Sequence, residues 1–156
     1  MTQIKTTTDS GDKWHKRYLS LAKEVSYWSK DPSKKIGAVI VGKAGQIVSL
    51  GYNGFPRNVK DSPERLSNKE TKLKLVVHAE MNAIYNAIHN NASTIGCTMY
   101  VTGLPICSEC AKGIIQVGIT TVVMDTKPEK GSWKESGELA IQLFKEAGVK
   151  IKYIKD

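Results

Sequence analysis

The chain has 156 residues and a hydrophobic fraction of 40%, which is enough for one ordinary domain with an apolar core. This composition excludes a collagen-like, disordered or low-complexity protein, and no apolar run approaches the roughly 20 residues of a membrane-spanning helix. The net charge of +8 (23 basic minus 15 acidic residues) favours anionic partners such as nucleotides or nucleic acid, but a solvated basic surface explains it as well.

The N-terminal sequence and the number of cysteines indicate the cellular compartment in which the protein is expected. Residues 1–11 are polar, lack the apolar core of a signal peptide and are expected to be a flexible segment of a single domain, residues 1–156. The three cysteines are an odd number without a secretory signal, which argues against a disulfide framework. We therefore expect a soluble, cytoplasmic protein without a membrane anchor.

The first predicted element is an amphipathic helix. Apolar residues recur at spacings of three and four through residues 12–30, and Asp31-Pro32 is expected to end the helix. The apolar positions are Trp14, Tyr18, Leu21, Val25 and Trp28.

A strand hairpin and a long loop follow this helix. Residues 35–42 and 46–52 are apolar runs typical of strands, with a turn at residues 43–45. Residues 53 to about 70 are polar and predict a long loop, which in a compact domain is often functional.

Strands and helices then alternate to the end of the chain, with glycine stops at Gly118 and Gly148. This order predicts an α/β domain whose layered sheet is largely parallel after the initial hairpin. The predicted elements are a helix over 79–90, a strand over 97–103, a helix over 107–117, a strand over 120–125, a helix over 135–148 and a strand over 149–155.

The stretch "GLPICSECAKGII" places two cysteines at a helix start. Free backbone N–H groups and the helix dipole lower the pKa of thiols there, and thiolates are the form that binds a metal. Cys107 and Cys110 alone fit a redox pair, half of a structural zinc site or coincidence. A four-cysteine site is excluded because only Cys97 remains, and Cys97 begins an apolar strand and is expected in the core. A redox pair more usually follows the first strand of its fold.

The stretch "VVHAEMNAI", residues 76–84, supplies a third ligand. His78 also lies at a helix start, and two helix starts at one sheet edge would bring it to Cys107 and Cys110. One imidazole and two thiolates leave the fourth position of tetrahedral zinc open for water, as in catalytic sites. Glu80 would lie near that position and could move a proton from water to a substrate nitrogen. Each motif alone is weak, but the two in this order are a strong signal.

These motifs identify a family. H-x-E followed by P-C-x-x-C is the signature of zinc-dependent nucleobase deaminases, and "HAEMNAI" with "CSECAKGIIQVGI" resembles it. "DPSKKIGAVIV" and "GYNGFPRN" extend the resemblance to the deoxycytidylate (dCMP) deaminase branch, over about residues 14–149. One departure is Ile106, which stands between Pro105 and Cys107 where the family has proline directly before the cysteine. This insertion leaves the geometry of the base-contacting loop open.

The resemblance implies a fold and a reaction. The fold would be cytidine deaminase-like, with three layers and a mixed five-stranded sheet flanked by helices. The reaction would be the zinc-dependent hydrolysis of dCMP to dUMP and ammonia, which supplies the precursor of dTMP. His78, Cys107 and Cys110 would hold one zinc ion, and Glu80 would carry the protons.

The resemblance also suggests contacts with the substrate. Asn53 corresponds to an asparagine that contacts the sugar or base, although Asn-Gly equally predicts a turn. Trp133 follows a loop where relatives place a base-stacking aromatic, although an ordinary helix-start aromatic fits slightly better. Residues around the Pro32 turn are either phosphate donors or a solvated lysine cluster. The substrate-binding candidates are Lys30, Ser33, Lys35, Asn53, Ala79 and Trp133.

The resemblance to the dCMP deaminase branch also implies how the protein would be regulated and assembled. Members of this branch are oligomers, often hexamers, activated by dCTP and inhibited by dTTP at a separate site, so we expect a regulated homo-oligomer. Arg57 and Lys60 would meet the triphosphate charge, with Mg²⁺ bridging its oxygens, unless they are solvated loop charges. The regulatory candidates are Tyr52, Asn53, Gly54, Arg57 and Lys60.

Three alternatives to dCMP deamination differ in class. Against a non-catalytic zinc module stands Glu80, since a structural site needs no proton carrier. Against a deaminase of bases in RNA or DNA stands the lack of a concentrated basic and aromatic cluster, so nucleic acid is not an expected partner. Against a cytidine or deoxycytidine nucleoside deaminase stands "GYNGFPRN", which resembles the nucleotide branch.

Overall fold

The computed structural model describes residues 8–155. Of the N-terminal segment expected to be flexible, residues 1–7 lie outside the described part, and the chain is helical from Thr8 onward. No helix within residues 8–155 combines the length and apolar character needed to cross a membrane. The elements are α1 (Thr8–Ser26), β1 (Gly37–Val41), β2 (Ile47–Tyr52), α2 (Pro63–Ser67), α3 (Lys69–Leu75), α4 (Ala79–His89), β3 (Thr98–Thr102), α5 (Ser108–Gln116), β4 (Thr121–Met124), α6 (Lys134–Ala147) and β5 (Lys150–Tyr153).

The five strands form one mixed sheet in the order β2-β1-β3-β4-β5. β1 is antiparallel to both β2 and β3, while β3, β4 and β5 are parallel to one another. The predicted hairpin followed by a parallel half is therefore confirmed. Because α5 and α6 return the chain between parallel strands, β3, β4 and β5 all end at the same edge of the sheet.

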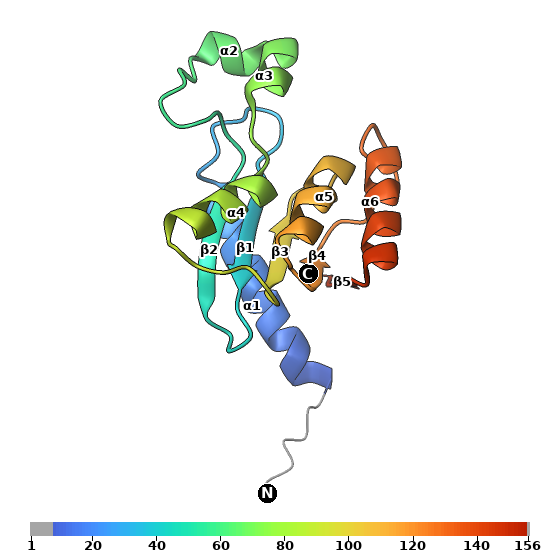
Figure 1. Cartoon of the computed structure of the whole chain (residues 1–156). Helices are drawn as coiled ribbons and strands as arrows, with labels where there is room; N and C mark the ends of the chain where they lie inside the picture. The colour runs from blue at the N-terminus through green and yellow to red at the C-terminus, as the bar shows by residue number, and fades with distance from the viewer. Residues whose placement is uncertain (1–7, 156) are drawn as a thin grey trace, which may run out of the picture.

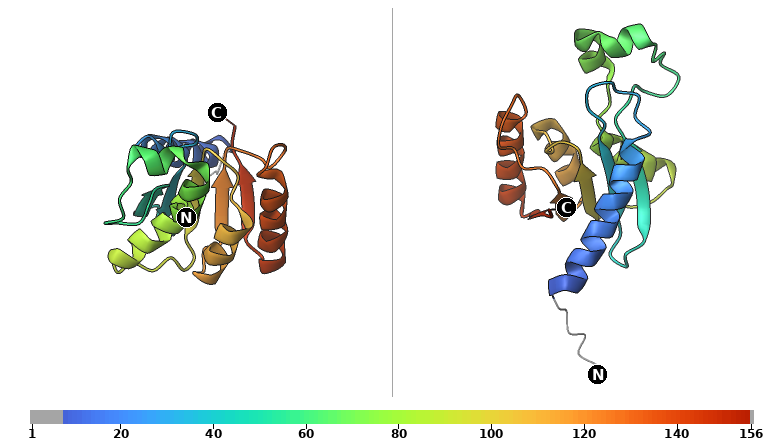
Figure 2. Two further views of the ribbon diagram at one scale, coloured as in Figure 1. Left: turned by 90° about the horizontal axis from the view of Figure 1, so that it is seen from above. Right: turned by 180° about the vertical axis from the view of Figure 1, so that it is seen from behind.

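Helices cover both faces of the sheet, as predicted for a three-layer fold. α1 lies across one face, and α4, α5 and α6 lie on the other (Figures 1 and 2). In β1, Ala38 and Ile40 join the core under α4 to α6, while Val39 and Val41 join the core under α1. All five residues of β1 are buried, which is why this strand is a continuous apolar run in the sequence.

The first helix is shifted relative to its prediction. It ends at Ser26 rather than near residue 30, and Trp28 lies in the following turn with 55% of its surface exposed. Trp14 is also half exposed, whereas Leu19, Ala22 and Val25 are buried. The buried face therefore runs along the middle of the helix and does not include the two tryptophans.

The prediction of an unbroken loop up to about residue 70 was wrong, because two short helices begin within it. Ser62 Oγ accepts the backbone N–H of Arg65 at the start of α2, and Asn68 Oδ1 accepts that of Thr71 at the start of α3. Such N-caps stabilise helix ends. α2 and α3 extend beyond one end of the sheet (Figure 1).

Candidate metal centre and active site

Two helix starts meet at one edge of the sheet. His78 immediately precedes α4 and Cys107 immediately precedes α5, and both have extended backbone conformations. His78 Nδ1 lies 3.4 Å from Cys107 Sγ and 3.3 Å from Cys110 Sγ, and all three atoms lie within 4.8 Å of one another. Ligands of tetrahedral zinc, bound at about 2.0–2.3 Å, stand roughly 3.5 Å apart. The donor types and spacing of this set therefore fit a zinc ion.

Glu80 lies in the first turn of α4 and is only 4% exposed. Burial raises the pKa of Glu80 to about 7, while the His78 charge and a backbone N–H oppose the shift only in part. A carboxyl group with a pKa near the working pH can both take and release a proton. Glu80 therefore has the protonation behaviour of a general acid and base.

The surroundings of Cys107 at the start of α5 lower the pKa of its thiol. Hydrogen bonds from the Cys110 thiol, the His78 ring and the Cys110 backbone N–H outweigh burial and lower the pKa of Cys107 to about 4. The Cys110 backbone N–H lies 3.4 Å from Cys107 Sγ. The thiolate, which is the metal-binding form, is thus the favoured state of Cys107.

Asn53 braces the turn between α1 and β1. Its Oδ1 accepts the backbone N–H of Ile36 at 2.9 Å, its Nδ2 donates to the carbonyl of Lys34 at 2.9 Å, and its side chain is buried. Ser29 Oγ also donates to the Asn53 carbonyl at 2.7 Å. The amide is therefore engaged with backbone at both ends, and a contact with substrate stays a prediction.

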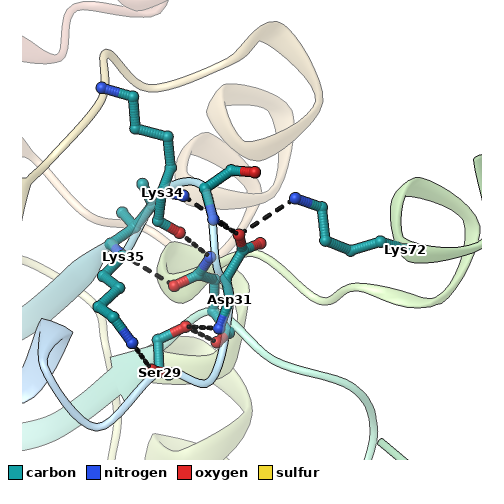
Figure 3. A network of polar contacts seen from close by, with 8 residues as sticks. Ser29, Asp31, Lys34, Lys35 and Lys72 are labelled. Atoms are coloured by element: carbon teal, nitrogen blue, oxygen red, sulfur yellow. Dashed lines mark hydrogen bonds and ion pairs between the residues drawn. The ribbon is translucent and has the colours of Figure 1, made fainter. Parts of the chain in front are cut away.

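The phosphate-binding candidates around Pro32 have separate partners. Lys30 Nζ lies 3.0 Å from Asp61 in an exposed ion pair. Lys35 Nζ donates to the Ser29 carbonyl (Figure 3). The Ser33 backbone N–H donates to Asp31 at 2.8 Å. Their side chains belong to one turn but do not form a single lysine cluster.

The other two substrate candidates lie at helix starts. Ala79 is fully buried at the start of α4, and Trp133 is half-buried just before α6. Two serines that the sequence did not single out tie α6 to the metal centre, because the backbone N–H of Ser108 donates to Ser136 Oγ at 2.9 Å. Trp133 thus directly precedes the helix that contacts the start of α5. A bond between two serines that lie 28 residues apart cannot be predicted from the local sequence.

Residues 12–126 match the model of the family described as "Cytidine and deoxycytidylate deaminase zinc-binding region". The chain belongs to this deaminase family. It is 43% identical to deoxycytidylate deaminase of Mus musculus over 141 residues, which are 87% of this chain and 76% of the mouse protein. It is 40% identical to an uncharacterized deaminase from the luxG 3' region of Aliivibrio fischeri, over 91% of this chain and 94% of that protein.

Solved deaminase structures share the fold. The crystal structure of dCMP deaminase from the cyanophage S-TIM5 in apo form superposes with a TM-score of 0.73 at 24% identity, covering 91% of this chain and 98% of that chain. This match confirms the cytidine deaminase-like fold with its mixed five-stranded sheet.

The residue that departs from the deaminase pattern is packed into the core. Ile106 is 1% exposed and belongs to the apolar cluster under α4 to α6. Three residues earlier, Gly103 has a φ of +111°, and a Cβ there would lie 2.7 Å from the Lys35 carbonyl oxygen. The loop before Cys107 therefore turns sharply at a glycine, buries the Ile106 side chain and delivers Cys107 to the metal centre.

A cavity of about 140 Å³ separates this deaminase's GYNG segment from α2 and α3. Tyr52, Asn53 and Gly54 line it, so three of the five regulatory candidates share one cavity. Trp28 and Tyr52 meet edge to face there, with ring centroids 6.0 Å apart. The remaining lining residues are Lys30, Asp31, Phe55, Asp61, Leu66, Lys72 and Val76.

Arg57 and Lys60, the other two regulatory candidates, are not among the residues that line this cavity. Arg57 Nη2 donates to Asn86 Oδ1 of α4 at 2.6 Å, and the Lys60 carbonyl accepts Arg65 Nη1 at 3.1 Å. Their predicted contact with a triphosphate stays a prediction.

Proposed function

We propose that this deaminase hydrolyses dCMP to dUMP and ammonia, with one zinc ion held by His78, Cys107 and Cys110 and with Glu80 as proton carrier. The observation that carries the proposal is the convergence of one imidazole and two thiols beside a buried carboxyl group at two helix starts. Relatives named deoxycytidylate deaminase, 40% identical in Homo sapiens and 43% in Mus musculus, support dCMP as the cytosine compound.

Glu80 has the central chemical role in this proposal. When bound, zinc supplies Lewis acidity that brings the pKa of water toward neutrality. Glu80 takes a proton from the attacking water and passes it to ring nitrogen 3 of the cytosine. It then moves the second proton, from the new hydroxyl group at carbon 4, to the amino group, which leaves as ammonia. One water molecule is consumed, the bond between carbon 4 and the amino group breaks, and a carbonyl forms at carbon 4.

The substrate contacts form a second part of the proposal. The turn with Lys30, Ser33 and Lys35 is assigned to the 5'-phosphate, and its support is the close approach of Gly103 to the Lys35 carbonyl. That approach places the turn beside the loop that ends in Cys107. Asn53 and Ala79 are assigned to the sugar and base. Trp133 is assigned to stacking on the base, because its helix is tied to the start of α5.

A substrate panel tests the proposal. Deoxycytidine, cytidine, CMP, dCMP and a short cytosine oligonucleotide are compared by kcat/KM on zinc-loaded protein. Two charge-assisted phosphate contacts at about 1.5–3 kcal/mol each predict that dCMP exceeds deoxycytidine by at least a hundredfold. Equal values for the two would promote the nucleoside alternative, and preference for the oligonucleotide would promote the nucleic-acid alternative.

A lysine variant makes the same test residue-specific. Lys35→Ala should narrow the gap between dCMP and deoxycytidine, because only the nucleotide loses a contact. Lys74→Ala is the matched control, since Lys74 is an exposed lysine of α3 paired with Glu70. If both variants narrow the gap equally, the phosphate assignment of the Pro32 turn is wrong.

We further propose that the cavity beside Tyr52 and Gly54 binds the base and sugar of dCTP or dTTP, with Arg57, Lys60 and Mg²⁺ meeting the triphosphate. Its support is a short connection to the metal centre. Gly54 exchanges two backbone hydrogen bonds with Val77, at 3.1 and 2.8 Å, and His78 is the next residue. A nucleotide that binds two arrangements of this segment unequally would shift activity, typically by 1–3 kcal/mol.

The regulatory proposal is tested by dCMP saturation with dCTP, with dTTP and without either, each with Mg²⁺. Superimposable curves from protein shown to be oligomeric would exclude the regulatory site. Sedimentation measures whether the assembly is the expected hexamer. Cytoplasmic location stays a prediction.

A further inference from the structure

Asn82 and Asn86 of α4, together with Asn90 directly after its last residue, lie along the outer side of β2. Within residues 8–155, β2 is an edge strand whose strand partner is β1, so the carbonyls on its other side need other donors. Each asparagine donates its Nδ2 to one of these carbonyls, and the donors are four residues apart while the acceptors are two apart. The pairs are Asn82 with Tyr52 at 2.8 Å, Asn86 with Leu50 at 2.7 Å and Asn90 with Val48 at 3.5 Å.

The spacing of the asparagine donors and the spacing of the β2 carbonyls cannot match along the whole length of α4. Four residues of α-helix rise about 6.0 Å, whereas two residues of strand span about 6.8 Å. The bonds of Asn82 and Asn86 are short and that of Asn90 is long, so helix and strand match between Asn82 and Asn86 and no longer match at the end of α4. Of the two asparagines with short bonds, Asn82 is the one in the turn of α4 that contains Glu80 and follows His78.

The start of α4 also touches β2 backbone to backbone. A Cβ on Gly51 would lie 2.4 Å from the Ala79 carbonyl oxygen and 2.3 Å from the Ala83 nitrogen. Asn82 Nδ2 lies 3.4 Å from the carbonyl of Val77, the residue directly before His78. Gly51 thus sets how close the helix lies to the strand, and Asn82 sets its position along the strand.

We propose that Asn82 is a positioning residue of the deamination, which acts through α4 and rests on the function proposed above. Its bond to the Tyr52 carbonyl fixes α4 along its axis, so that the Glu80 carboxyl and the His78 imidazole keep their places relative to Cys107 and Cys110. Displacement of a reacting group by about 1 Å can cost about a hundredfold in rate. A loss of this one amide donor is therefore expected to appear in the chemical step.

The test compares Asn82→Asp with Asn90→Asp. Each variant keeps the side-chain shape and replaces the donor by an acceptor, but only the first lies at the start of α4. For Asn82→Asp we expect kcat for dCMP to fall about 10- to 100-fold with KM changed less than about threefold, and zinc to be lost faster to a chelator. Asn90→Asp should keep wild-type kcat and zinc release. Asn82→Ala, which adds no charge, serves as a second variant if Asn82→Asp does not fold.

Two outcomes would overturn the proposal. One is an Asn82 variant with wild-type kcat and zinc release, and the other is an equal loss in the Asn82 and Asn90 variants, which would indicate general destabilisation. If the wild-type protein does not deaminate dCMP, the function proposed above fails instead. In that case faster zinc release from the Asn82 variant, with unchanged release from the Asn90 variant, still supports the positioning role.

Discussion

Lys72 and Asp31 stand 41 residues apart in the sequence and form an ion pair of 3.1 Å whose side chains are only 10% and 9% exposed. Asp31 Oδ1 also accepts the backbone N–H groups of Ser33 and Lys34 (Figure 3). The pair therefore fastens α3 to the turn between α1 and β1. It connects the segment beyond the sheet to the turn assigned to the substrate phosphate.

Removal of the Lys72 ammonium group should destabilise the folded state, because the Asp31 carboxylate would stay buried without its partner. We expect Lys72→Ala to lower the free energy of unfolding by about 3 kcal/mol, measured by urea denaturation. Lys74→Ala, which breaks an exposed pair with Glu70 in the same helix, should change it by less than about 0.5 kcal/mol. Equal effects of the two variants would contradict a stabilising role for the buried pair.

His15 predicts a pH dependence of stability. Its Nδ1 lies 2.8 Å from the Tyr100 hydroxyl, and burial, together with the charge of Lys152, lowers the pKa of His15 below 6.5, although Asp12 opposes the shift. The folded state then binds fewer protons than the unfolded state, so the stabilisation is present above pH 6.5 and is lost as the pH falls through the folded-state pKa.

Thermal melting between pH 7.5 and 5.5 measures this effect. His15→Gln keeps a side chain that can bond to Tyr100 but does not titrate, so its Tm should fall less with acid than that of the wild type. All other histidines are common to both proteins and cancel in the comparison. Parallel curves for the two proteins would show that His15 does not contribute.

The two kinds of buried cysteine should respond differently to substitution. We expect Cys110→Ser to lose stoichiometric zinc, because the metal then keeps one thiolate and one imidazole. Cys97→Ser is the matched control, since Cys97 is equally buried but lies outside the His78 cluster. The zinc content per chain is measured by metal analysis after dialysis. One tightly held zinc per chain in Cys110→Ser would refute the assignment of Cys110 as a zinc ligand.

The role of Glu80 in proton transfer can be tested independently of zinc binding by an isosteric substitution. Glu80→Gln should keep the fold and the zinc but lower kcat for dCMP by at least a hundredfold, because the amide cannot carry the proton. Glu109→Gln, at an exposed glutamate between the two cysteine ligands, should keep wild-type activity. Retention of most of the rate in Glu80→Gln would reduce Glu80 to a helix-start residue.

Local patterns predicted most of the architecture. β1 is buried on both faces and is therefore an unbroken apolar run, and the helix starts at His78 and Cys107 follow directly from the motif positions. α2 and α3 were missed because each is short and charged, without an apolar stripe. The local signals were their caps, Ser62 and Asn68.

Tertiary partners account for what the sequence could not predict. The burial of Lys72 depends on Asp31, and the two bonds of the Asn53 amide depend on a turn that lies 17 to 19 residues earlier. Neither partner follows from helical or strand periodicity, which describes neighbours within one element. His78 is also far from the two cysteines in the sequence. Their contact could nevertheless be predicted, because these residue types together are typical ligands of one metal ion.

The asparagines along β2 have a consequence for solubility. An open strand edge is a template for another strand, and such addition leads to aggregation. The carbonyls of Val48, Leu50 and Tyr52 already accept side-chain donors, so a strand added at this edge would compete with the asparagine side chains for them. At the opposite edge, β5 has only four residues and exposes Lys150 and Lys152, which repel a like strand. Both edges of the sheet therefore disfavour the addition of another strand, which favours helix faces and loops as the surfaces through which copies of this chain associate.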